Sequence, residues 1–384
     1  MILWQRVRAV KLWGSTPRAQ RPKLFSGLSS AWPERLALVA AQAPSIAGAV
    51  NVLTEVVTKP GSVEVAGLVQ ASHEVASWAE EHGRIETALQ YAEAAAIADQ
   101  DNPAAAALAG QLCTRVAAID RATVWLYRSM ELARRGKDRE WQIRSRLRLG
   151  AHLFQLAEYA PAKRLFQSAY NIALRTGRRV LAAQAQHDLL TLASDRGTYA
   201  EGEMHAWEAL RLYPVSNPRV APLAHDYAFL LTKHHYFAPA LTILEAALPL
   251  VRQPQERITV LATLARTAAS RGNRDRFEEA REEVLQIAKA SEERAAAAFV
   301  RLAEGLLSFG EWEQAGKMAR NAVEIATRRK EVEPRGLAEA LLEECTQRRA
   351  PESDKGVPEG SRIEILARKF LSRLRKQQRS APAK

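Results

Sequence analysis

The sequence repeats itself along most of its length, and this self-similarity constrains the fold more than any other feature. One pattern recurs: a small residue, a turn with glycine or polar residues, and then a small residue followed by apolar or small residues four and seven positions later. In the clearest copy, residues 302–322, Gly310 precedes Ala315, Ala319 and Ala322. Because positions i, i+4 and i+7 share one face of a helix, the pattern predicts pairs of antiparallel helices that cross at the small residue.

The small residue that opens each second helix gives the period of the repeat. These anchors are Ala88, Ala122, Ala162, Gly202, Ala240, Ala280 and Ala315, spaced by 34, 40, 40, 38, 40 and 35 residues. Pro161 and Pro239 each precede an anchor by one residue, in the first turn of a helix, where a missing N–H costs little. Where a first helix must end, glycine can adopt the left-handed conformation, and the candidates are Gly83, Gly197, Gly272 and Gly310. The copy around Ala280 has three extra residues after its glycine, so its register is open.

This spacing and residue pattern resembles the tetratricopeptide repeat superfamily over residues 69–327. Steps near 40 residues resemble the long-helix variants that are common in bacterial signalling and regulatory proteins. Two residues depart from the pattern: Leu190 fills a slot usually held by a small residue, and Pro249 falls inside a predicted second helix. The resemblance implies an all-α fold, a right-handed α-solenoid of about seven helical hairpins.

The segments outside the repeats are expected to close and extend the array, because terminal repeats otherwise expose apolar faces. The expected parts are a basic N-terminal arm (1–32), N-terminal capping helices (33–68), the array (69–327), a C-terminal capping helix (328–349), a linker (350–360) and a basic amphipathic tail (361–384). Ser361 and Glu364 form a capping box at the start of the tail helix. Its apolar stripe is Ile363, Leu366, Phe370 and Leu374. The stripe could dock on the array or on a second copy, or lie on a membrane surface.

The net charge of +12 is concentrated at the two ends of the chain. Residues 1–35 carry +6 and residues 355–384 carry +7, which leaves about −1 for the 319 residues between them. Two solvated arms would explain this distribution, and so would contact with nucleic acid, an anionic membrane or an acidic protein patch. The tail residues that would face an anionic partner are Arg368, Lys369, Phe370, Arg373, Arg375 and Lys376.

The sequence carries no motif for catalysis or for a cofactor. It has no GxxxxGK[ST] phosphate loop, no GxGxxG after a strand, no HExxH and no GxSxG, and strand-like alternation is scarce. The neighbouring His234 and His235 would point about 100° apart on a helix and make a poor metal chelate. Cys113 and Cys345 form no CxxC and suit a reducing compartment, and bases interrupt the N-terminal apolar run. A non-enzymatic cytoplasmic protein without metal or cofactor is therefore predicted.

The resemblance implies that the first helix of each repeat lines a concave groove that binds another protein. The residues placed there are Arg115, Arg144, Phe154, Gln155, His187, Asp195, His225, Phe229, Lys233, Arg266 and Glu304. Aromatic side chains mixed with charges of both signs suit a helix or an extended peptide. We therefore expect an interaction scaffold. The alternative is a bacterial regulatory or sensor protein in signalling or transcription control, whose basic ends contact nucleic acid or an anionic membrane. The partner and the oligomeric state are left open.

Overall fold

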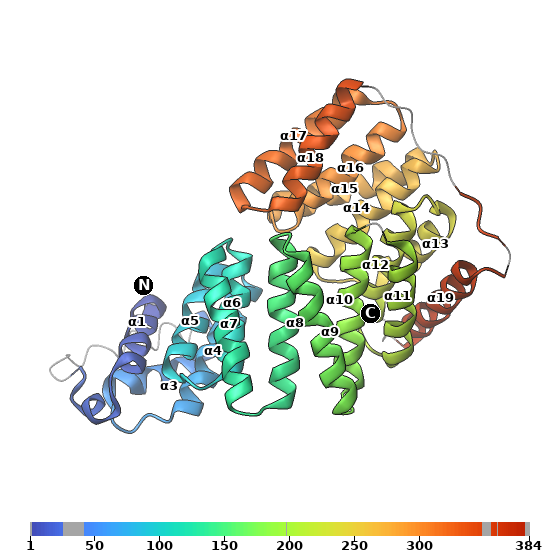
Figure 1. Cartoon of the computed structure of the whole chain (residues 1–384). Helices are drawn as coiled ribbons and strands as arrows, with labels where there is room; N and C mark the ends of the chain where they lie inside the picture. Colours follow the sequence, from blue (N-terminus) through green and yellow to red (C-terminus); the bar gives the residue numbers. More distant parts are fainter. Residues whose placement is uncertain (1, 26–41, 197, 348–354, 359, 381–384) are drawn as a thin grey trace. The chain divides into compact units, whose positions relative to one another are not determined.

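The computed structural model describes residues 2–25, 42–196, 198–347, 355–358 and 360–380, and every regular element in these ranges is a helix (Figure 1). The chain divides into two compact units, Met1–His152 and Leu153–Lys384. The predicted all-α fold is confirmed. The boundaries assigned to the arm, the caps and the array stay predictions.

The first unit holds α1 (Ile2–Ser15), α3 (Ala47–Thr58), α4 (Val65–Glu81), α5 (Ile85–Ala98), α6 (Pro103–Arg115), α7 (Ile119–Arg135) and most of α8 (Arg139–Gln155). Two short 3-10 helices join them, η1 (Arg18–Lys23) and η2 (Pro44–Ile46).

The second unit holds α9 (Tyr159–Arg175), α10 (Arg179–Asp195), α11 (Tyr199–Leu212), α12 (Val220–Lys233), α13 (Phe237–Ala247), η3 (Leu248–Leu250), α14 (Pro254–Ser270), α15 (Arg274–Ala290), α16 (Ala295–Ser308), α17 (Trp312–Arg329), α18 (Val332–Gln347) and α19 (Arg362–Ser380).

Successive helices pair as the repeat predicts. Hairpins α4/α5 and α6/α7 lie in the first unit, and α10/α11, α12/α13, α14/α15 and α16/α17 lie in the second. The helices of the seventh predicted pair, α8 and α9, are both present. All seven predicted anchors are buried: Ala88, Ala122, Ala162, Gly202, Ala240, Ala280 and Ala315.

The turns between paired helices show that one of the predicted anchors is at the wrong position. Six of them contain a residue with a left-handed backbone: Gly83, Ala117, Ala157, His235, Gly272 and Gly310. In five hairpins the predicted anchor follows this residue by five positions, but five positions after Gly272 stands Phe277, not Ala280. This copy therefore has no insertion. Its anchor position is three residues earlier than predicted, and Phe277, a large side chain, occupies it. Gly197 lies outside the described residues.

Glycines on facing helices make room for large side chains at these crossings. A Cβ on Gly305 of α16 would lie 2.7 Å from a ring carbon of Phe277, which is fully buried. A Cβ on Gly202 would lie 2.7 Å from Leu230 and 3.5 Å from Leu190. Gly202 therefore makes room for Leu230 of α12, whereas a Cβ would meet Leu190, which departs from the small-residue rule, at an ordinary contact distance.

Three prolines lie at or near the ends of helices. Pro161 and Pro239 are the third residues of α9 and α13, so both lie in a first turn as predicted. Pro249 does not lie inside an α-helix: α13 ends at Ala247 and the chain continues as η3. A proline cannot supply the N–H that would continue the helix, so α13 has only 11 residues.

The N-terminal segment is not a solvated arm where the structure describes it. Helix α1 packs on α5 and α3, and Val10 and Trp13 are 0% and 1% exposed. The indole N–H of Trp13 donates to the carbonyl oxygen of Pro60 at 2.7 Å. Lys11 forms an ion pair with the buried Glu93 at 3.0 Å. Several basic residues of this segment therefore serve packing rather than an external partner. Residues 26–41, the end of the predicted arm and the start of the predicted caps, lie outside the described residues.

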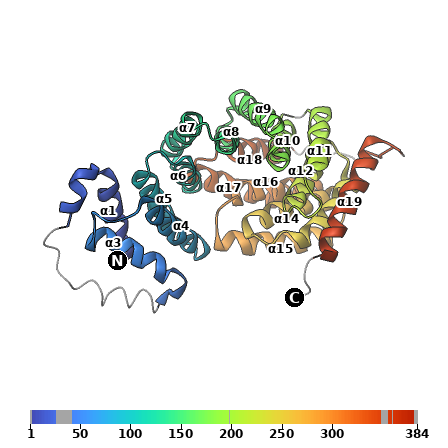
Figure 2. The same cartoon turned by 90° about the horizontal axis from the view of Figure 1, so that it is seen from below.

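The C-terminal helix α19 docks on α12 and α13, and Figures 1 and 2 show it beside these helices. The stripe of Ile363, Leu366, Phe370 and Leu374 is buried. The ring of Phe370 stacks on Tyr227, with 5.2 Å between ring centroids. At the start of the helix, the amide of Glu364 donates to the hydroxyl of Ser361 at 3.3 Å, one half of the predicted capping box. Docking on the array is therefore the alternative that the structure supports.

Candidate binding surface of the second unit

Side chains from the first helices of successive hairpins meet on one surface of the second unit. We call this the first-helix surface; its members are Asp195, Phe229, Lys233, Arg266, Arg301, Glu304 and the nearby Glu333 of α18. These residues come from α10, α12, α14, α16 and α18, so the surface exists only because the hairpins stack in order.

Phe229 of this surface lies close to two cations. The guanidinium carbon of Arg301 lies 4.5 Å from the ring centroid, and the ammonium of Lys233 lies 5.5 Å from it. Both distances permit attraction between a cation and the ring face. Lys233 also lies 4.0 Å from Asp195, and Arg266 pairs with Glu304 at 3.2 Å.

Arg301 has more donors than partners. One of its terminal N–H groups donates to the carbonyl of Ala297, in its own helix, at 3.0 Å. Its Nε is buried without a hydrogen-bond partner, and no carboxylate of the described residues lies within ion-pair distance. Burial lowers the pKa of Arg301, although a guanidinium stays charged near neutral pH. A guanidinium offers five N–H donors, so this side chain retains the capacity to bind an external carboxylate.

Burial disfavours the ionised form of two carboxyl groups of the surface, Asp195 and Glu333. Burial, helped by Glu333, raises the pKa of Asp195 to about 7, against the opposing effect of Lys233 and Arg301. Burial likewise raises the pKa of Glu333. Near neutral pH a large fraction of Asp195 is therefore protonated, and the positive charges of Lys233 and Arg301 are not fully balanced.

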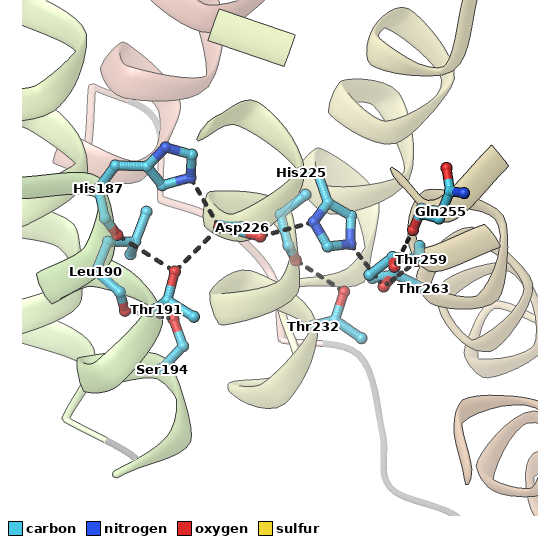
Figure 3. Close-up of polar contacts among 11 residues, drawn as sticks. His187, Leu190, Thr191, Ser194, His225, Asp226, Thr232, Gln255, Thr259 and Thr263 are labelled. Carbon is cyan, nitrogen blue, oxygen red and sulfur yellow. Dashed lines mark hydrogen bonds and ion pairs between the residues drawn. The ribbon is translucent and has the colours of Figure 1, made fainter. Parts of the chain in front are cut away.

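A hydrogen-bond network centred on Asp226 joins α10, α12 and α14 (Figure 3). One carboxylate oxygen lies 2.7 Å from Nε2 of His187 and accepts the hydroxyl of Thr191 at 3.0 Å. The other lies 2.7 Å from Nδ1 of His225, whose Nε2 lies 2.9 Å from the hydroxyl of Thr263. Burial would raise the pKa of Asp226, but the hydrogen bonds from His187 and His225 hold it below its ordinary value.

The predicted groove residues divide into three groups. Five of them meet on the first-helix surface: Asp195, Phe229, Lys233, Arg266 and Glu304. His187 and His225 are buried, and their ring nitrogens bond to Asp226 and Thr263.

The third group comprises the four remaining residues, which make other contacts. Phe154 packs edge-on against Tyr159 at 5.8 Å, and Gln155 is exposed at the end of α8. In the first unit, Arg115 pairs with Glu80, and Arg144 pairs with Glu140 at 2.7 Å in its own helix.

Sequence reasoning missed Asp226, Arg301 and Glu333. The sequence does contain a signal for Asp226 and Arg301. Asp226, Thr263 and Arg301 each stand nine residues before the left-handed residue of their hairpin, namely His235, Gly272 and Gly310. A search of that slot across the repeats would have found a polar residue in three successive first helices. Glu333 lies outside the repeats and carries no such signal.

The tail candidates also divide, and one of them is wrong. Phe370 is fully buried against Tyr227, so the prediction that it faces an anionic partner fails because its ring belongs to the core. Arg373 donates to the carbonyl of Tyr213 at 2.8 Å. Lys369 lies 3.9 Å from the centroid of Trp207, and Arg368 pairs with Glu364. Arg375 and Lys376 are exposed.

Within the described ranges, no three His, Cys, Asp or Glu side chains are grouped so that they could hold a metal ion. None of the described helices combines the length and apolar character that crossing a membrane requires.

No protein-family model matches the sequence, and neither does any curated protein. Solved structures do match. The quorum sensor NprR from B. thuringiensis, in its apo form, aligns with a TM-score of 0.51 and 15% identity over 76% of this chain and 86% of its own. The Rap conjugation gene regulator of the plasmid pLS20, solved with a Phr peptide, aligns with a TM-score of 0.51 and 12% identity over 89% of this chain and 96% of its own.

A signal-transduction ATPase with a tetratricopeptide repeat sensor, from Pyrococcus horikoshii, aligns with a TM-score of 0.50 and 12% identity over 88% of this chain and 53% of its own. At such low identity these likenesses concern the fold alone. Together with the ordered hairpins and their buried anchors, they identify the chain as having the tetratricopeptide repeat fold.

Proposed function

We propose that the first-helix surface binds an extended segment of another protein, so that the chain acts as an interaction scaffold without catalytic activity. The observation that carries this proposal is Arg301, a half-buried guanidinium with an unpartnered Nε and, among the described residues, no carboxylate within ion-pair distance. A bound carboxylate would supply the counter-charge that Arg301 lacks among the described residues, through charge-assisted hydrogen bonds to its terminal N–H groups.

The chemistry of the surface indicates what the segment carries. A carboxylate would bind Arg301 and Lys233, and an apolar side chain would cover the exposed part of Phe229. The network around Asp226 links three of the helices that carry the surface, so binding would order little beyond the segment itself. The Rap regulator solved with a Phr peptide is an example of a peptide complex in a chain of similar fold.

The test is a selection of random peptides displayed against the full chain. We expect enriched peptides to contain an acidic residue beside an apolar one. Affinity for them should fall at least tenfold in Arg301→Met, which keeps the length of the side chain and removes its charge. Arg328→Met is the matched control, since Arg328 lies on the exposed side of α17 and pairs with Glu292. The proposal fails if no peptide is enriched above an unrelated protein, or if Arg301→Met and Arg328→Met bind the enriched peptides equally well.

A further inference from the structure

Docking divides helix α19 into a buried face and a basic face. The exposed residues of α19 are Arg362, Ile365, Arg368, Lys369, Ser372, Arg375, Lys376, Gln378, Arg379 and Ser380. At 100° per residue, the six bases among them fall within an arc of about 140°, and at 1.5 Å per residue they extend over about 25 Å. We call these six bases the basic strip: Arg362, Arg368, Lys369, Arg375, Lys376 and Arg379.

The C-terminal half of the basic strip has no balancing charge. The only acid of α19, Glu364, pairs with Arg368, and Arg362 lies 3.4 Å from Glu203. Arg375, Lys376 and Arg379 form no ion pair among the described residues. Three adjacent, exposed and uncompensated cations therefore occupy one end of the helix.

Polar contacts with the array hold the strip in place. Gln377 donates to the carbonyls of Val215 and Asn217, both at 2.7 Å, and Gln378 donates to the carbonyl of Ala246 at 2.8 Å. With the buried stripe on the opposite face, these contacts set the orientation of the helix before any partner arrives. A partner would then meet a preformed row of charges and would not have to order the tail.

We propose that the basic strip binds the phosphate backbone of a nucleic acid, without reading its sequence. A duplex carries about one negative charge per 1.7 Å, which a straight row of cations can follow along its length. A membrane surface fits less well. An amphipathic helix binds lipid by inserting its apolar face, but Leu366, Phe370 and Leu374 are already buried in the array. The exposed large apolar residue on the helix is Ile365, at 41%.

The experiment is fluorescence anisotropy of a labelled random-sequence duplex of about 20 base pairs with the full chain, over roughly 50 to 200 mM salt. The affinity should fall with salt by about 0.9 log unit per log unit of salt for each phosphate contacted. Replacing Arg375, Lys376 and Arg379 with glutamine should weaken binding at least tenfold and make the salt slope shallower by about two to three. A triple variant that keeps all three positive charges, Arg375→Lys with Lys376→Arg and Arg379→Lys, should retain binding.

The matched control neutralises three exposed bases of α17, Lys317, Arg320 and Arg328, and lowers the net charge by the same amount. Equal binding by the tail and α17 variants would overturn the proposal, since net charge alone would then explain the affinity. It would also be overturned if the wild-type chain ignored the duplex but sedimented with phosphatidylserine vesicles or bound poly-glutamate. The altered residues are exposed, so circular dichroism should show unchanged helix content in every variant.

Discussion

The substitution Gly305→Ala tests the packing of α15 against α16, where Phe277 takes the place of a small anchor. Alanine in a helix interior is about 1 kcal/mol more favourable than glycine, so the substitution alone should stabilise α16. The new methyl carbon, however, would lie 2.7 Å from a ring carbon of Phe277, which is fully buried and cannot swing into solvent. Overpacking of this kind costs about 1 to 3 kcal/mol. The net effect should be a loss of up to about 2 kcal/mol.

Gly336→Ala is the matched control, because a Cβ at Gly336 of α18 has nothing within 4 Å. That substitution should stabilise the protein by about 1 kcal/mol, so the two variants should differ by about 1 to 3 kcal/mol. Urea unfolding followed by circular dichroism gives the difference from the shift in midpoint at constant m-value. In a Phe277→Leu background, Gly305→Ala should approach the gain of the control. Equal gains at both glycines, or a cost that persists beside Leu at position 277, would refute the packing argument.

Three further predictions concern the network, the surface and the turns. Asp226→Asn should destabilise the protein by about 2 kcal/mol near pH 7. Because the pKa of Asp226 is held below its ordinary 3.8, the ionised carboxylate stabilises the fold above that pH. The difference in stability between variant and wild type, measured by urea unfolding, should therefore shrink as the pH falls below about 4. Asp195→Asn should behave in the opposite way. The raised pKa of Asp195 makes its ionisation costly as the pH rises from 3.8 towards 7, so the variant should be more stable than wild type by up to about 4 kcal/mol above pH 7 and no different below about pH 4. Ala157→Gly should stabilise the protein by about 0.5 to 1 kcal/mol in thermal unfolding, because Ala157 holds a left-handed backbone with φ of 61°, whereas Ala151→Gly in the body of α8 should destabilise it by about 1 kcal/mol.

The period of small residues was enough to predict the hairpins, because close helix crossings demand small side chains and these recur visibly in the sequence. The same rule led to Ala280 instead of Phe277. The space for Phe277 comes from Gly305, on a different helix, and a rule applied to one helix at a time cannot detect compensation from another.

The candidate surface was predictable only in part. Asp195, Phe229 and Lys233 were found because they face the same side as their repeat partners. Arg301 was missed because its importance lies in having no carboxylate partner among the described residues, a property of three-dimensional surroundings that residue type does not reveal. The sequence predicts a basic arm where α1 lies, and for α19 it predicts an apolar stripe without deciding what the stripe packs on. The packing of both helices depends on Trp13 and Phe370, whose receiving surfaces belong to helices far away in sequence.

The packing of Phe370 against Tyr227 has a practical consequence. Tyr227 is fully buried because α19 covers it, and the carbonyls of Val215, Asn217 and Ala246 have glutamine donors for the same reason. A shortened chain that stops before Ser361 would uncover an aromatic ring and release these carbonyls to water. Such a fragment should self-associate through the apolar surface that α19 covers in the intact chain. Its behaviour in solution would then differ from that of the intact chain.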